Sequence, residues 1–484
     1  MFSPRRMHPV AAIISFLKQL KDFLFPFLII IFFGDFSGGI EVVVTGILLL
    51  IVLLIGILQW YRFKYWVEDG ELRMEFGVFV RKKRYIPFEK MQSLDLTEGI
   101  LQRPFKLAAV KIETAGSSGD IEANLTAIRK SEAEELRQYM LRSKMKEKVV
   151  LEEAEEDTAL EEMVIDQPIY KMDFSSLLLL ASTSGGALVV IATVFGFLSQ
   201  FSEIIPVDSV TAQMDNLVGG NYLLIAILFI MMIFVAWLIA VIGSILKYYN
   251  FSLAVDGENL VVTKGLLEKK NVTVPLERIQ AITISENFLR KLLGYCTVEV
   301  VSAGGSIQEA GSSTVVILPF VKATEVANIL EEHLVYYDFR LPLKHGPLSS
   351  WVYHVLSRLV WWLVVTGIAM YFLGSYWYFG FIILAILLLN SYLKAKNTAY
   401  QVQDQLLVIS SGAIIKTTKF LRRKRIQSIE KRKSFFHKNR PIASINASIM
   451  SGLGGAVGML FFIEEEDCDA IYQWYSYTEK NQDE

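Results

Sequence analysis

Cysteine and histidine are scarce in this chain, and neither is spaced for metal binding. The 484 residues include two cysteines, Cys296 and Cys468, and five histidines that form no HxxH or HxxxH pair. Two thiols so far apart make no disulfide framework, and zinc sites need clustered Cys or His ligands. We therefore expect neither a metal nor a cofactor.

Motifs of catalysis are also missing. The sequence has no GxSxG segment with a partnered histidine, and the glycine-rich GLGGAVG at 452–458 lacks the Lys-Ser or Lys-Thr pair of a phosphate loop. Acidic residues gather at 152–157 (EEAEED) without accompanying His or Asn, which is typical of a solvated segment. We predict an acidic linker at residues 148–170 and a protein that is not an enzyme.

Apolar residues, in contrast, are abundant. They make up 53 % of the chain, and the mean hydropathy is +0.39. This composition indicates several membrane spans rather than an ordinary soluble enzyme. Charged residues still account for 20 % of the chain, so a large part of it must face water.

Long apolar runs come in pairs. A span needs about 20 mostly apolar residues. The six candidates are 23–33 with 42–58, 175–200 with 222–246, and 359–373 with 377–393. The loop inside each pair carries no Lys or Arg. Because Lys and Arg are enriched in cytoplasmic loops, we predict a six-span plasma-membrane protein with both termini in the cytoplasm.

The polar segment that follows each pair repeats one order of motifs. A turn comes first and is followed by a basic–apolar–Gln element. This element begins with Pro87 in the first copy (PFEKMQ) and with Pro275 in the second (PLERIQ). In the third copy we expect Phe420 to take the place of this proline. The residues of this structural repeat motif are Asp69, Gly70 and Gln92, then Asp256, Gly257 and Gln280, then Asp404 and Gln427. We interpret each glutamine as bonding the backbone of an adjacent turn.

Each copy is expected to contain short strands followed by one helix. Residues 67–75 and 253–263 alternate around Asp-Gly, which is a strong hairpin signal. Closing helices are expected at 130–145, 322–334 and roughly 466–477, the first with an apolar stripe of Ala133, Leu136, Met140 and Leu141. Strands first and a helix last favour a small antiparallel barrel or sandwich that is plugged by its helix.

Two-span hairpins followed by such a domain resemble the bacterial pleckstrin-homology-like (PH-like) membrane proteins, and the triplicated layout resembles their YdbT-like members. The resemblance rests on the Asp-Gly turns and on PLERIQAI with its counterparts. It implies an α+β membrane protein of three transmembrane helical hairpins, each followed by a small antiparallel, seven-stranded PH-like β-barrel with a C-terminal helix. It also implies a partner, a smaller paralogous membrane protein with one hairpin and one such domain. The expected boundaries are hairpins at 1–61, 171–247 and 339–394, and PH-like domains at 62–147, 248–338 and 395–484.

Positive charge is concentrated near the C-terminus of a chain whose net charge is −2. Between Lys416 and Arg440 there are eleven Lys or Arg and one acid, Glu430. In a domain tethered to a span, each cation near the anionic inner leaflet is worth about 1 kcal/mol, and neighbouring aromatic side chains can insert at the interface. The candidate lipid-binding residues are Arg422, Arg423, Lys424, Arg425, Lys431, Arg432, Lys433, Phe435 and Phe436 in copy three, and Arg81, Lys82, Lys83 and Arg84 in copy one.

The basic stretch is also compatible with functions other than lipid binding. A solvated face is one alternative, and docking to an acidic partner or to the acidic linker is another. No RNA-binding signature with paired aromatic residues accompanies the cations, so we expect no nucleic-acid partner.

The sequence therefore predicts a non-enzymatic multi-pass membrane scaffold. Its cytoplasmic PH-like domains are expected to bind anionic membrane lipids, a partner membrane protein, or both, and the resemblance implies a role in cell-envelope stress protection. The alternative is a lipid or small-molecule transporter that uses the six-helix bundle, with a hydrophobic cleft lined by the small-residue patch 182–186. Ion transport is disfavoured because spans three, four and six contain no buried charge.

Overall fold

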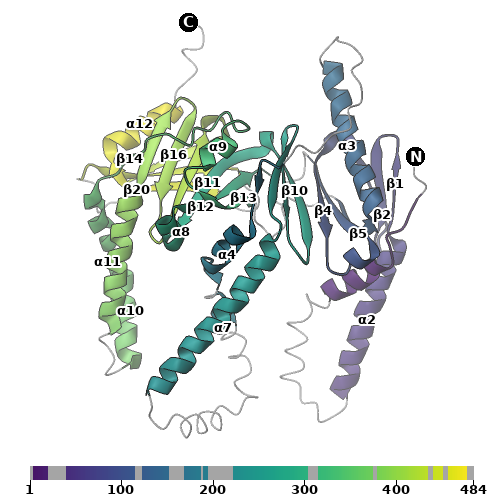
Figure 1. Cartoon of the computed structure of the whole chain (residues 1–484), viewed down its shortest axis with the longest axis horizontal. Coiled ribbons are helices and arrows are strands. Elements are labelled where there is room, and N and C mark those ends of the chain that lie inside the picture. Colours follow the sequence, from purple (N-terminus) through teal and green to yellow (C-terminus); the bar gives the residue numbers. More distant parts are fainter. Residues whose placement is uncertain are drawn as a thin grey trace. The chain divides into compact units, whose positions relative to one another are not determined.

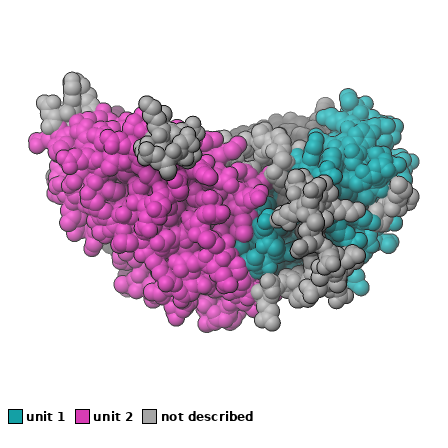
Figure 2. Space-filling model, turned by 90° about the horizontal axis from the view of Figure 1, so that it is seen from above, with its two compact units in different colours: residues 1–167, 254–275 teal, residues 168–253, 276–484 magenta. Residues whose placement is uncertain are grey.

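The chain divides into two compact units, coloured separately in Figure 2. Unit 1 is Met1–Gln167 with Ala254–Pro275, and unit 2 is Pro168–Leu253 with Leu276–Glu484. The computed structural model describes residues 4–19, 40–114, 123–151, 168–186, 189–193, 222–303, 314–373, 379–433, 440–450 and 456–476.

Unit 1 contains the first copy of the repeat and most of the opening strands of the second (Figure 1). Its elements are α2 (Ile40–Arg62), β1 (Lys64–Glu68), β2 (Glu71–Phe76), β3 (Lys82–Pro87), η2 (Phe88–Lys90), β4 (Met91–Glu98), η3 (Arg103–Phe105), β5 (Leu107–Thr114), β6 (Ala123–Arg129), α3 (Lys130–Leu151), β9 (Asn259–Lys264) and β10 (Lys269–Pro275). Strand β8 (Ser252–Asp256) begins in unit 2 and ends in unit 1.

Unit 2 contains the rest of the second copy and the whole of the third. The second copy has β7 (Tyr170–Lys171), α4 (Phe174–Ser182), α7 (Tyr222–Tyr248), η4 (Leu276–Arg278), β11 (Ile279–Asn287), α8 (Phe288–Leu293), β12 (Tyr295–Ser302), β13 (Thr314–Lys322) and α9 (Val326–Leu330). The third copy has β14 (Lys344–His345), η5 (Leu348–Ser350), α10 (Trp351–Leu373), α11 (Phe379–Asn397), β15 (Ala399–Gln403), β16 (Leu406–Ser411), β17 (Ile415–Arg422), η7 (Arg423–Arg425), β18 (Ile426–Arg432), β19 (Ile442–Ile449), β20 (Ala456–Glu464) and α12 (Glu465–Ser476).

The strands of each copy form two antiparallel meanders, and successive copies share sheets. In unit 1, β1-β2-β3 form one sheet, while β6-β5-β4 continue through β10 into β9 of the second copy. In unit 2, β13-β12-β11 continue through β17 into β16, β15 and β14, and β18-β19-β20 form a separate sheet. The β11–β17 junction comprises seven residue pairs, from Ala281↔Leu421 to Asn287↔Ile415.

This topology differs from the expected closed barrel. In the described residues, β3 does not pair with β4, and no copy closes on itself. The exposed edges of β4 and β11 would present unpaired N–H and C=O groups, and the next copy covers them by strand pairing. A seventh strand per copy does exist, but it is short and precedes the hairpin. It is β7 in copy two, β14 in copy three, and the bridge from Arg5 to Tyr65 in copy one.

The basic–apolar–Gln element is the point where the chain changes sheet. A 3-10 turn, η2 in copy one and η7 in copy three, carries the chain from the first meander to the second. The extended residue before each turn is Pro87 in copy one and Arg422 in copy three, with ψ of 136° in both. The counterpart of Pro87 is therefore Arg422, and the expectation that Phe420 takes this place was wrong.

The hairpin turn of the second copy is shifted by one residue relative to the turns of the first and third copies. Asp69 (φ 53°) and Gly70 (φ 75°) both adopt left-handed conformations, as a type I′ turn requires. In the third copy Asp404 has φ 48° and forms the turn with Gln405. In the second copy the turn falls one residue later, on Gly257 and Glu258. Asp256 ends β8 instead, and its carboxylate accepts a hydrogen bond of 3.0 Å from Arg137 of α3.

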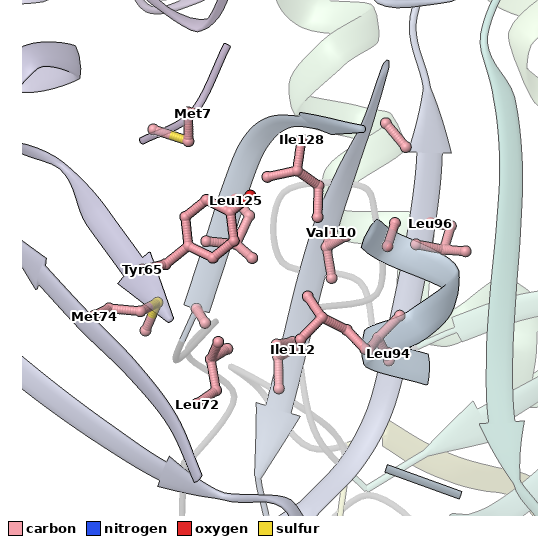
Figure 3. Packing of buried hydrophobic residues seen from close by; sticks show 14 of the residues in the cluster. Met7, Tyr65, Leu72, Met74, Leu94, Leu96, Val110, Ile112, Leu125 and Ile128 are labelled. Carbon is pink, nitrogen blue, oxygen red and sulfur yellow. The ribbon is translucent and has the colours of Figure 1, made fainter. Parts of the chain in front are cut away.

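The core of unit 1 lies between the two meanders of copy one and is closed by α3. Figure 3 shows side chains from β1 and β2, such as Tyr65, Leu72 and Met74, facing Ile112 and Leu125 from β5 and β6. Ala133, Leu136 and Met140 of the expected stripe are buried against them, and the side chain of Leu141 lies outside the described residues. Each buried Leu, Ile, Val or Met contributes roughly 1.5–3 kcal/mol. In unit 2, Cys468 and Ile471 of α12 close the equivalent core of copy three.

The structure supports fewer membrane spans than the six expected. Among the described residues, two helices are long and apolar enough to cross a membrane, Ala226–Tyr248 and Leu348–Ile368. Two shorter apolar helices are Val10–Gln19 and Leu50–Arg62. The expected span from 175 to 200 is interrupted, because α4 ends at Ser182 where the hydroxyls of Thr183 and Ser184 bond helix carbonyls. Segment 23–33 lies outside the described residues.

Candidate membrane-facing site

The strands that follow an apolar helix have one end beside that helix, which we call the helix-proximal end. In unit 1, Arg62 closes α2 and donates a hydrogen bond of 2.8 Å to the carbonyl of Val78 in the β2–β3 loop. In unit 2, Asn397 closes α11, and its amide donates to the carbonyls of Gly412 and Ala413 in the β16–β17 loop, at 3.0 and 3.1 Å. The two loops are therefore equivalent, and the β1–β2 and β15–β16 turns lie at the helix-distal end.

The four predicted cations of copy one lie at the helix-proximal end. Arg81 precedes β3, and Lys82 pairs in register with Phe76 next to the loop. All four, from Arg81 to Arg84, are exposed. Arg81 and Lys83 both contact the carboxylate of Glu75, and the hydrogen bond from Arg81 lowers the pKa of that acid. Arg81 and Lys83 therefore share one acid among the contacts described, and Lys82 and Arg84 alternate with them along the chain.

Apolar side chains at the same loops were missed by the sequence analysis. Phe79 is 91 % exposed and Val80 69 %, and the matching residues Ile414 and Ile415 are 61 and 54 % exposed. Each loop begins with a glycine in the left-handed region, Gly77 or Gly412, both with φ of 113°. The signal was present in the sequence as GVFVRKKR and GAIIKTTK, in which a glycine and an apolar pair precede cations.

The cluster from Arg422 to Arg425 lies at the helix-distal end. Arg422 pairs with Leu406, five residues along β17 from Thr417 at the other end, or about 16 Å at the rise of a strand. The Arg422 guanidinium lies 3.9 Å from the ring centroid of Tyr336, and that of Arg423 lies 5.7 Å from the ring of Trp474. Arg425 donates to the carbonyl of Glu277. Lys424 is exposed.

A groove of about 340 Å³ adjoins this cluster. Arg422 and Lys424 line one side, and the segment after α9 lines another with Tyr336 and Asp338. Asp404 of the β15–β16 turn also lines it. The groove therefore mixes two cations with two acids, which suits a partner of mixed charge better than a bare anion.

Three further cations lie at the end of β18, where the chain has returned toward the helix-proximal end: Lys431, Arg432 and Lys433. Acidic side chains contact them. Lys431 bonds Asp469 and Glu465 of α12, and Lys433 bonds Glu465 at 2.6 Å. These hydrogen bonds raise the pKa of Lys431 and lower that of Glu465. Arg432 is exposed and pairs only with Glu430 on the same strand among the contacts described, at 2.7 Å. Phe435 and Phe436 lie outside the described residues.

The repeated glutamines do not share one environment. Gln280 is buried, and its amide donates to the carbonyl of Arg278 in the adjacent turn at 3.1 Å. Gln427 is exposed, and the side chain of Gln92 lies outside the described residues. In the described part of the chain, no group of three or more His, Cys, Asp or Glu side chains is arranged to hold a metal ion.

Three PH-like copies joined to apolar helices define the class of this protein. Residues 18–144, 188–334 and 359–479 match the family described as bacterial PH domain. The chain belongs to this family, which confirms the resemblance drawn from the repeated motifs. The match is to a family of PH-like domains and not to a family of enzymes.

The relatives found are named as transmembrane proteins. The UPF0699 transmembrane protein YdbT of Bacillus subtilis (strain 168) is 32 % identical over 490 residues, which cover 99 % of each chain. The UPF0699 transmembrane protein YdbS of the same strain is 25 % identical over 134 residues, 21 % of this chain and 82 % of YdbS. No solved structure matches the chain. Similarity to YdbT over the whole length supports a membrane location.

Proposed function

We propose that this protein is a non-enzymatic membrane scaffold whose PH-like copies bind anionic lipid headgroups at their helix-proximal ends. The polar segments and both termini lie on the cytoplasmic side, where the leaflet is anionic. The observation that carries the proposal is the exposed cluster Arg81–Arg84, which lies at the same end as the contact between Arg62 and Val78 and follows the exposed Phe79 and Val80.

A different role is proposed for the cluster Arg422–Arg425. Because it lies about 16 Å farther along the strands, we propose that it docks a partner protein through the groove at Arg422 and Lys424. A smaller membrane protein of the YdbS type is the proposed partner. We also propose a role of this assembly in cell-envelope stress protection, which the family resemblance supports.

Lipid or small-molecule transport is the alternative function. An apolar groove of about 260 Å³ lies between the segment that contains Val190 and Ile191 and the helix α7, next to Met231 and Val235. The small-residue patch does not line it, because Ser184 and Gly186 pack against Ser244 and Ala240 of α7. Vesicles that contain the protein and labelled lipid test the alternative, which requires faster transbilayer movement than in empty vesicles.

Native mass spectrometry of the full chain with mixed neutral and anionic lipids tests the proposed function. We expect the protein to retain anionic lipid preferentially, and we expect the preference to fall when Arg81, Lys82, Lys83 and Arg84 are changed to Gln. The matched control changes Arg422, Arg423, Lys424 and Arg425 to Gln and should keep the preference. Equal retention of neutral and anionic lipid by the unmodified protein would refute the proposal.

A further inference from the structure

Helix α8 carries an exposed apolar face. Phe288, Leu289, Leu292 and Leu293 are 64, 51, 77 and 50 % exposed. At 3.6 residues per turn these four side chains fall on an arc of about 140°, and Arg290 and Lys291 lie outside that arc. Apolar side chains grouped on one face mark an interaction surface, whereas single exposed apolar residues do not.

The position of α8 along the neighbouring membrane hairpin is fixed by its first turn. The amide of Asn287 donates to the carbonyl of Thr183 at 2.9 Å, and the guanidinium of Arg290 donates to the Thr183 hydroxyl at 3.2 Å. Thr183 follows α4 directly. The adjacent Ser184 contacts Ser244 of α7 at 3.2 Å.

These contacts place α8 at the depth of the last turns of a membrane span. The span Ala226–Tyr248 ends four residues beyond Ser244, which is about 6 Å at the helical rise. Lys291 also donates to Asn397, the last residue of α11, at 3.1 Å. Figure 1 shows α8 lying between α4 and α11. Helix α8 therefore lies beside the ends of α4 and α11.

The same loop in the first copy has a similar surface. Ile100, Leu101 and Phe105 are 60, 42 and 57 % exposed, and the ring of Phe105 lies 5.8 Å from that of His8, two residues before the apolar helix Val10–Gln19. In the sequence, GILQRPFK, NFLRKLLG and SFFHKNRP occupy this place in the three copies, each with apolar residues beside cations.

We propose that α8 lies in the interfacial layer of the bilayer and inserts its four apolar side chains among the acyl chains. Arg290 and Lys291 lie outside the apolar arc and bond Thr183 and Asn397, so the apolar arc is the side of α8 that does not make these contacts. The proposal rests on the proposed function only for the membrane location, because insertion does not require anionic lipid. It defines a second mode of lipid contact for the second copy, through apolar side chains rather than through cations.

Site-specific fluorescence in nanodiscs tests this proposal on the full chain. A Leu292→Cys variant carries an environment-sensitive dye and is reconstituted in neutral lipid with or without spin labels on the acyl chains. The two native cysteines are fully buried and should not react. The matched control is Val335→Cys. The Val335 side chain lines the helix-distal groove and is 78 % exposed, nearly the same as the 77 % of Leu292. Phe288→Cys serves as a second position if the first variant fails to fold.

The expected result is a blue-shifted dye at Leu292 that loses most of its emission to the spin-labelled lipid, and a dye at Val335 that does not. A water-exposed dye at Leu292 would overturn the proposal. A blue-shifted dye that the lipid does not quench would also overturn it, because a protein surface would then cover α8. The two experiments fail separately, because the nanodisc lipid is neutral. If the dye at Leu292 is quenched but native mass spectrometry shows no preference for anionic lipid, the proposed function alone is refuted. If native mass spectrometry shows that preference but the dye is not quenched, this inference alone is refuted.

Discussion

At the scale of single residues, one buried carboxyl group lies where the first two copies pair and makes the stability of unit 1 depend on pH. Asp95 in β4 is 3 % exposed, and its Oδ1 accepts the backbone N–H of Thr273 in β10 at 3.0 Å. Burial raises the pKa of Asp95 to about 7, and the nearby carboxylate of Glu113 acts in the same direction. The folded state therefore binds this proton more tightly than the unfolded chain does.

The stability of unit 1 should accordingly fall as pH rises. The stabilisation that Asp95 provides is complete below the pKa of this group in the unfolded chain, and it is lost as pH rises through about 7. Between about pH 5 and pH 8 the free energy of unfolding should therefore fall by roughly 2–3 kcal/mol. Thermal unfolding in detergent should show this slope in the unmodified protein. Asp95→Asn keeps the acceptor oxygen and should flatten this slope. Glu89→Gln changes an exposed acid and should leave the slope unchanged. An unchanged slope in Asp95→Asn would assign the pH response to other groups.

At the scale of elements, α12 holds cations of copy three that would otherwise face the helix-proximal end. Glu465 and Asp469 in its first turns bond Lys431 and Lys433 of the β18 end. These side chains are about one-quarter to one-half exposed, so the pairs are screened and individually weak. Their main consequence is to reduce the positive charge that copy three offers to lipid.

Removing these two acids should increase anionic lipid binding. Glu465→Gln with Asp469→Asn releases Lys431 and Lys433, so the retention of anionic lipid in native mass spectra should rise at low salt, and the rise should shrink in high salt. The control is Glu430→Gln, which removes an exposed pair with Arg432 and should have a smaller effect. Unchanged retention in the double variant would mean that these lysines do not face the membrane.

The first and last closing helices were predicted well from local sequence patterns, whereas the second, expected at 322–334, is the short α9. The first closing helix was expected at 130–145 and is α3 (Lys130–Leu151), and the last was expected at 466–477 and is α12 (Glu465–Ser476). The pairing of β4 with β10 and of β11 with β17 was not predicted, because edge pairing between distant segments leaves no local periodicity. The exposed pairs Phe79–Val80 and Ile414–Ile415 were not predicted, because a short apolar run has no periodicity that separates an exposed loop from a buried strand.

At the scale of the whole molecule, the copies are not independent modules. The third copy supplies β17 to the edge of β11, and Ala281 and Val301 of the second copy belong to the core cluster of the third. Copy three on its own would lack these neighbours. Functional experiments therefore need the full chain.

Deleting residues 339–484 should destabilise what is left of unit 2. The deletion uncovers the edge of β11 over seven residue pairs and exposes Ala281 to water, so the shortened protein should aggregate in size-exclusion chromatography. Removing residues 477–484 alone should leave a monodisperse protein. A monodisperse shortened protein with unchanged amide exchange in β11 would show that the second copy folds without the third.

The central claim is that the helix-proximal ends contact anionic lipid and the helix-distal ends do not. Hydrogen exchange of the full chain in neutral and anionic nanodiscs measures this directly. We predict that anionic lipid slows exchange at 77–84 and 412–416 and leaves 403–406 and 421–425 unchanged. Equal protection of both sets, or protection of the helix-distal set alone, would contradict the account.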